Sequence, residues 1–194
     1  MKNEEYINGY LNEMRGLIDR VPKEKIDNII EMIFEAWKNG NNIFIMGNGG
    51  SASTATHFAA DLSKTAAVDG KKRLKAISLT DNIPLISAWT NDAGFDNIYV
   101  GQLENFLNPN DVVIAISVHG GRKDWSGNLV KALEFAKQKS AVTIGLTGFD
   151  GGEMKNIADE CLIVPVESTP HVESFHVALH HLIVFRLKEK IKNE

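Results

Sequence analysis

A glycine-rich segment, Gly47-Asn48-Gly49-Gly50-Ser51, lies between a short apolar run and a stretch of small and hydroxyl residues. Glycines let backbone amides approach an anion closely, the Ser51 hydroxyl can add a hydrogen bond, and a helix starting here would present its positive end. The segment matches neither the P-loop pattern, which needs a following Lys-Ser/Thr pair, nor GxGxxG, whose last glycine is missing. Taken alone, it fits a phosphate-binding loop and an idle strand-to-helix turn about equally well.

A second segment of this kind follows the apolar run 111–116 and leads through a glycine pair into a helical pattern. In an open α/β sheet, ligands bind outside the carboxyl ends of the strands. Two such loops can grip one phosphate monoester from two sides, so we predict a phosphate site made by both. Its expected binding residues are Asn48, Gly49, Gly50, Ser51, Ser117, His119 and Ser126.

Histidines and acids occur at helical spacing in two places. His57 and Asp61 are four residues apart, so they share one helix face about one turn beyond the glycine loop. Near the end of the chain, one helix face would carry an acid and three imidazoles: Glu173, His176, His180 and His181. Such groups transfer protons or hold metals. For His176 and His180 we favour a role in the core or an interface.

The elements that must position these residues follow from the apolar pattern. Helical spacing from Glu4 to Asn39, broken around Val21-Pro22, predicts two helices. Short apolar runs predict strands buried on both faces at 43–46, 111–116, 142–146 and 161–166, with a weaker one at 74–79. Helical segments are expected at 51–64, 82–91, 126–139 and 172–192. This alternation predicts an α/β fold with a parallel sheet between helices.

Composition narrows the partners. The formal net charge of -4 and the scattered lysines and arginines give no footprint for nucleic acid, so we expect a small-molecule partner and no nucleic acid. No stretch approaches the ~20 apolar residues of a membrane span, and the first ten residues lack an apolar signal core. We therefore expect a cytoplasmic protein without membrane contact. Because Cys161 is the only cysteine, any metal site must use histidines and carboxylates.

Taken together, the motifs resemble the sugar isomerase (SIS) domains and, within them, the phosphoheptose isomerases. The resemblance covers nearly the whole chain and rests on GNGGSASTATHFAADL, TNDAGFDNIY at 90–99, AIS at 115–117, LTGFDGGEM at 146–154 and the spacing from Glu173 to His181. It implies a three-layer α/β/α fold with a five-stranded parallel sheet and long N- and C-terminal helices. The implied single SIS domain spans 1–194, with 1–40 packing in the oligomer and 41–194 forming the sheet core and C-terminal helix.

The resemblance also implies a reaction. Phosphoheptose isomerases interconvert sedoheptulose 7-phosphate and D-glycero-D-manno-heptose 7-phosphate through an enediol, and so supply heptose for nucleotide-heptose and surface polysaccharide synthesis. They are usually homotetramers with active sites between subunits, and many bind one zinc per site. By this analogy the metal ligands are His57, Asp61, Glu173 and His181.

The analogy also assigns individual roles. Asp61 would be the base and His181 the acid, with Glu173 as a second catalytic carboxylate. Asn91 and Asp92 match positions near the sugar hydroxyls, although alone they are typical of a helix-ending turn.

The chain departs from the family pattern at three points. Asp61 replaces the usual Glu, which withdraws the carboxylate by one carbon–carbon bond, ~1.5 Å. Glu173 replaces Gln, so the carboxylate role can have moved from 61 to 173. The usual Ser-x-Ser-Gly-Asn-Ser loop carries His119 at one serine and an insertion with Arg122 and Lys123. These cations either replace the lost hydroxyl contact or form a solvated loop tip.

Two other functions fit the pattern. One is a non-catalytic, phosphosugar-binding SIS regulator, like the partners of a DNA-replication initiator, and the change at Asp61 motivates it. His181 counts against it, because such relatives tend to lose that histidine. The other is an isomerase of another sugar phosphate, which would differ only in its pocket.

Overall fold

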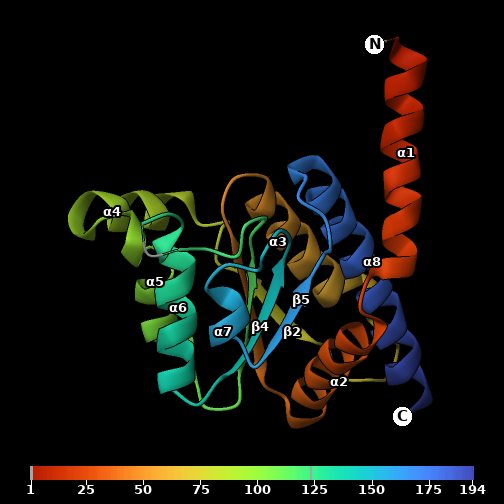
Figure 1. Ribbon diagram of the computed structural model, residues 1–194. Coiled ribbons are helices and arrows are strands. Elements are labelled where there is room, and N and C mark those ends of the chain that lie inside the picture. Colours follow the sequence, from red (N-terminus) through yellow and green to blue (C-terminus); the bar gives the residue numbers. More distant parts are fainter. Residues whose placement is uncertain (1, 123) are drawn as a thin grey trace.

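A five-stranded, fully parallel sheet forms the centre of the computed structural model, which describes residues 2–122 and 124–194 (Figure 1). The strand order is β2-β1-β3-β4-β5. The strands are β1 (Asn42–Gly47), β2 (Lys75–Ser78), β3 (Val112–Ile116), β4 (Val142–Thr147) and β5 (Glu160–Ile163). The five predicted runs are therefore confirmed as strands of a parallel sheet.

Alternating side chains of the central strands face two separate helix layers. Ile43 and Ile45 of β1 belong to one hydrophobic cluster, whereas Phe44 and Met46 belong to the other. All four are fully buried, as expected for a strand covered on both faces. The sheet is thus the middle layer of a three-layer α/β/α sandwich, as predicted.

The helices flank the sheet in two groups. The first cluster includes residues of α1, α2, α3 and α8, and the second includes residues of α5 and α6 (Figure 1). Their bounds are α1 (Asn3–Arg20), α2 (Lys23–Asn39), α3 (Gly50–Ala60), α4 (Ile83–Ala93), α5 (Val100–Phe106), α6 (Gly127–Gln138), α7 (Met154–Ile157) and α8 (Thr169–Asn193). The two predicted N-terminal helices are confirmed, with their break at Val21 and Pro22.

Two element boundaries and the burial of one strand differ from the prediction for local reasons. β5 ends at Ile163 rather than 166, because the N–H of Val166 bonds back to the carbonyl of Val164 at 2.8 Å, in a tight turn around Pro165. The predicted helix 51–64 divides into α3 and a π-helical turn over Asp61–Thr65. β2 is an edge strand whose Lys75 and Ile77 are exposed, so it is not covered on both faces.

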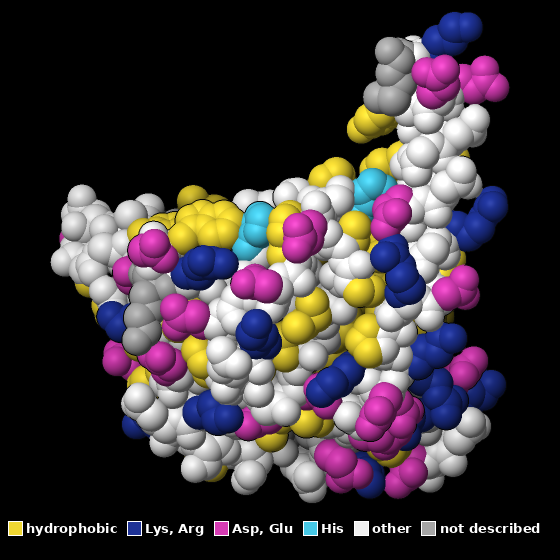
Figure 2. Space-filling view, in the orientation of Figure 1, with side chains coloured by type: hydrophobic (Ala, Val, Ile, Leu, Met, Phe, Trp, Pro, Cys, Tyr) yellow, Lys and Arg dark blue, Asp and Glu magenta, His cyan; other side chains and the backbone are white. Residues whose placement is uncertain are grey.

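Two helices extend beyond the body of the molecule. α1 projects at the N-terminal end, and α4 lies apart from the sheet with no buried residue (Figure 1). Acidic and basic side chains are interspersed over the face in Figure 2, rather than gathered by sign. Within residues 2–122 and 124–194, no helix is long and apolar enough to cross a membrane.

Candidate active site

The first feature of the site is a polar pocket where β1 and β3 lie side by side. The chain leaves β1 toward β2 and leaves β3 toward β4, so the strand order reverses at this point, which is where open α/β sheets bind ligands. The cavity measures about 320 Å³. Its lining includes all seven predicted phosphate-binding residues: Asn48, Gly49, Gly50, Ser51, Ser117, His119 and Ser126.

The glycine loop brings backbone N–H groups to this pocket. Gly49 precedes α3 with a φ of +55°, a conformation that favours glycine, and no side chain of the described residues caps the helix. The buried Ser51 places its hydroxyl in the first turn. Asn48 exchanges two amide hydrogen bonds of 3.0 and 2.9 Å with Asn128 of α6, which ties the loop to the second loop's helix. The N-terminus of α3 is thus open toward the pocket.

Three rings cluster at the loop after β3. The His119 ring lies 4.1 Å from Phe149 and 4.6 Å from Trp125, measured between ring centroids. Arg122 pairs with Asp150 at 3.4 Å, both side chains are more than half exposed, and Arg122 is not among the pocket's lining residues. Arg122 therefore lies on a solvated loop tip rather than in the phosphate pocket, and Lys123 falls outside the described residues.

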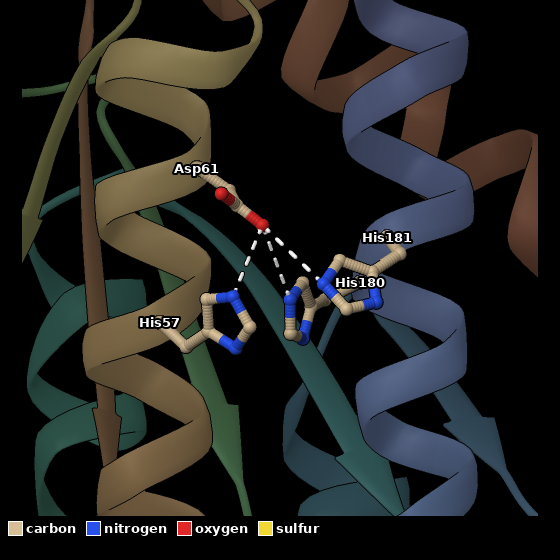
Figure 3. Close-up of side chains that lie close together, drawn as sticks. All are labelled: His57, Asp61, His180 and His181. Atoms are coloured by element: carbon tan, nitrogen blue, oxygen red, sulfur yellow. Dashed lines mark ion pairs between the residues drawn. The ribbon is translucent and has the colours of Figure 1, made fainter.

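The second feature is a cluster of three imidazoles around one carboxylate, between α3 and α8 (Figure 3). Oδ2 of Asp61 lies 3.4 Å from Nε2 of His57, 3.4 Å from Nε2 of His180 and 3.6 Å from Nε2 of His181. One ligand atom from each of the four residues lies within 4.8 Å of the others, so the group can hold a metal ion. The structure thus brings together three of the four predicted ligands.

The π-helical turn sets the position of Asp61. In this turn the N–H of Ala66 bonds to the carbonyl of Asp61 at 2.9 Å, five residues back, which widens the helix where the carboxylate leaves it. Thr65 donates its hydroxyl to Oδ1 of Asp61 at 2.8 Å. The other oxygen, Oδ2, is thereby held toward the imidazoles.

His176 and His180 both meet the expectation of burial, and of the two only His176 has a hydrogen bond among the described residues, at Nε2. Nε2 of His176 lies 3.2 Å from the carbonyl of Thr147, which is a core contact. His180 is fully buried, and neither ring nitrogen has a hydrogen-bond partner among the described residues. Burial lowers the pKa of His180 to about 4, and the neighbouring His181 and His57 add to this effect. His180 is therefore a neutral imidazole facing Asp61. In the sequence, its position next to His181 was the feature that could have indicated a role in the site.

Within the described residues, Glu173 is not part of the group that gathers around Asp61. Its Oε1 lies 2.5 Å from the position that a Cβ on Gly50 would take, and it lines the phosphate pocket. His57 is seven residues beyond Gly50 on α3, a rise of ~10 Å. Glu173 therefore belongs to the pocket, about two helical turns from the cluster.

Asn91 and Asp92 also lie outside the pocket. Both are exposed residues in the last turn of α4, and Asn91 donates to Oδ1 of Asp92 at 2.7 Å. Neither lines the phosphate pocket within this chain. They lie at the end of a helix, which agrees with the alternative interpretation of these residues as a helix-ending turn. A contact between them and a sugar would require a binding site other than the phosphate pocket of this chain.

Comparisons with known proteins decide the family. A model of the SIS domain matches residues 9–148, which is more than half of the chain. The chain belongs to the SIS domain family. Within that family it belongs to the phosphoheptose isomerases. The one from Syntrophotalea carbinolica is 38% identical over 188 residues, which cover 95% of this chain and 93% of that protein.

This SIS chain is also similar to a second curated protein and to a solved structure. The lincomycin biosynthesis protein LmbN of Streptomyces lincolnensis is 42% identical over 159 residues, which cover 79% of this chain. The chain spans only 58% of LmbN. A phosphoheptose isomerase structure from Francisella tularensis superposes with a TM-score of 0.89 at 26% identity, covering 97% of this chain and all of that one. The predicted SIS fold is thus confirmed.

Proposed function

We propose that this chain is a phosphoheptose isomerase that converts sedoheptulose 7-phosphate to D-glycero-D-manno-heptose 7-phosphate, for nucleotide-heptose and surface polysaccharide synthesis. One observation carries the proposal: an anion pocket and an imidazole–carboxylate cluster lie along the same two helices, α3 and α8, about two turns apart. A phosphate in the pocket would let an extended seven-carbon sugar reach the cluster with its C1–C2 end. The relatives named phosphoheptose isomerase, at 37–41% identity, support this substrate class.

The reaction exchanges a ketone for an aldehyde without loss of atoms. A base removes a proton from C1, the resulting enediol is reprotonated at C2, and a proton moves from O1 to O2. Asp61 is our proposed base, because it is the carboxylate in the cluster. His181 is the proposed acid, since its side chain is 43% exposed; its Nε2 faces Asp61 at 3.6 Å, so the proton would come from Nδ1. Glu173, at the phosphate end, would accept hydrogen bonds from sugar hydroxyls.

We further propose one zinc ion per active site. The donor set fits, because imidazole and carboxylate are zinc ligands, and the cluster contains a buried imidazole without a hydrogen-bond partner among described residues. His57, Asp61 and His181 would hold the ion. When bound, zinc would supply positive charge that stabilises the enediolate.

The test is NMR of sedoheptulose 7-phosphate in D₂O with purified, zinc-supplied protein. We expect an aldose 7-phosphate with solvent deuterium at C2. Absence of turnover with every ketose phosphate tried would overturn the proposal. Recovery of a stoichiometric protein partner by the inactive chain would then favour the non-catalytic regulator.

Two serines of α3 provide a matched test of phosphate binding in the pocket. Ser51→Ala removes a hydroxyl that lines the pocket, whereas Ser53→Ala removes an exposed one with no bond among described residues. A hydrogen bond to a charged group contributes ~1.5–3 kcal/mol, so S51A should raise KM by about 10- to 100-fold. S53A should leave KM unchanged, and equal effects of the two would argue against a phosphate in this pocket.

Assembly and location are also proposals. Large apolar side chains are exposed on α1 and α8: Tyr6, Ile7, Leu11, Ile18, Leu182 and Phe185. This supports a homotetramer in which residues 1–40 pack in the oligomer, residues 41–194 form the rest of a single SIS domain, and active sites lie between subunits. Light scattering should give four times the chain mass, and Ile18→Glu should lower it. The lone, half-buried Cys161 supports a cytoplasmic location.

A further inference from the structure

We infer that His180, and not Glu173, is the fourth protein ligand of the metal, which completes a site of three imidazoles and one carboxylate. This inference rests on the proposed function, whose metal site it defines. It differs from the ligand set implied by the family resemblance, in which position 173 supplies the fourth group.

The distances around Asp61 are those of a coordination shell. Zinc bonds of about 2.0–2.2 Å in a tetrahedron place neighbouring ligand atoms ~3.4 Å apart. Oδ2 of Asp61 lies 3.4, 3.4 and 3.6 Å from Nε2 of the three histidines. Figure 3 shows all three imidazoles directed at this one oxygen. His180 meets the same spacing as the two predicted histidines.

The burial of His180 gives an independent reason. A fully buried imidazole without hydrogen bonds loses its contacts with water, at a cost of ~1–3 kcal/mol, and the group that faces Nε2 of His180 is the Asp61 carboxylate at 3.4 Å. Another buried histidine of α8, His176, has a backbone partner in Thr147. A metal on Nε2 would satisfy the atom of His180 that faces Asp61.

The supports of the cluster also fit a metal site. Thr65 holds Oδ1 of Asp61 at 2.8 Å, in the way that groups behind a ligand fix its orientation. Glu173 lies beside Gly50 and lines the phosphate pocket. Three neutral imidazoles and one carboxylate leave a net charge of about +1 on a bound divalent ion, a balance common in zinc sites.

The experiment measures zinc affinity of metal-free protein by competition with a coloured chelator, without substrate. His180→Leu should weaken zinc binding at least tenfold, because a ligand is lost. Glu173→Gln should leave the affinity within about twofold of wild type. His176→Leu, which removes another buried histidine of α8, is the matched control and should also leave the affinity unchanged. Zinc loss in E173Q with normal binding in H180L would overturn the inference.

A second measurement does not depend on the folding of any variant. Zinc added to wild-type chain labelled with ¹⁵N in its histidines should shift three pairs of imidazole nitrogens, not two. Cobalt should bind wild type and E173Q with the same visible spectrum, and circular dichroism of metal-free H180L should show a folded chain. Two shifted imidazoles, or no zinc binding at all, would refute the inference.

The two proposals fail in different ways. A chain that binds zinc through three imidazoles but does not isomerise sedoheptulose 7-phosphate would refute the proposed function alone. A chain that isomerises it while H180L keeps full zinc affinity would refute only the role of His180.

Discussion

Glu173 and Gly50 fit together because Gly50 has no side chain: Oε1 of Glu173 lies 2.5 Å from the position that a Cβ would take. This contact joins α8 to the first turn of α3. It places the carboxylate beside the phosphate pocket and leaves Asp61 as the carboxylate in the imidazole cluster.

Glu173→Gln and Asp61→Asn should therefore change different kinetic constants, KM in the first variant and kcat in the second. E173Q should keep kcat within about threefold and change mainly KM, because the proposed role of Glu173 is to contact sugar hydroxyls. D61N should lower kcat by about 10²–10⁴-fold, the usual contribution of a general base. Steady-state kinetics on both variants separates the roles. A collapse of kcat in E173Q would return the base to position 173.

Gly50→Ala should impair the pocket without unfolding the chain. Alanine is a better helix former than glycine by ~1 kcal/mol, so the melting temperature should not fall. The new methyl group must displace the Glu173 carboxylate, so KM should rise. In an E173A background the same change should have a much smaller effect, because the displaced group is gone. Equal effects in the two backgrounds would contradict this explanation.

Two glycines with positive φ provide a matched stability test. A Cβ on Gly70, at φ +77°, would meet nothing within 4 Å, whereas a Cβ on Gly120, at φ +72°, would lie 1.9 Å from the carbonyl oxygen of Gly151. Gly70→Ala should cost only the left-handed conformation, ~1–2 kcal/mol. Gly120→Ala should cost clearly more, because two backbones must separate. Urea unfolding of both variants gives the comparison, and similar losses would refute the close packing of these loops.

His176 should make the metal-free chain less stable in acid. Burial lowers its pKa to about 4 from an ordinary 6.5, so between these values the unfolded chain binds a proton that the folded chain does not. Stability therefore falls as the pH falls, by about 2 kcal/mol at pH 5 from this residue. His176→Gln should reduce the loss between pH 7.5 and pH 5, measured by urea unfolding with a chelator present. An unchanged loss would contradict the assignment.

The sequence contained enough to predict the sheet but not which residues of one helix face meet at one site. Short apolar runs mark buried strands, so β1, β3 and β4 were predictable. Glu173 and His181 share a helix face, but eight residues separate them by ~12 Å along the axis, so a common face did not mean a common site. The π-helical turn at Asp61 has no counterpart in the apolar pattern, since it depends on how α3 meets its neighbours.

The site itself was half predictable for a similar reason. Both phosphate loops follow central strands, so the topology alone brought Ser51 and Ser117 together. His180 reads as a core residue because it is one, and only its distance from Asp61 reveals a second role. Arg122 could not be assigned from sequence, since its direction depends on Asp150 of another loop.

The exposed position of α4 has a consequence for hydrogen exchange. No residue of α4 is buried, whereas every residue of β3 is. Ile86 and Trp89 of α4 pack against the second hydrophobic cluster but stay partly exposed, so opening α4 exposes less apolar surface than opening the sheet, and its amide hydrogens should exchange first. Association with another subunit over this helix would slow that exchange. The deuterium uptake of one short helix, which carries Asn91 and Asp92, should thus report whether the chain is assembled.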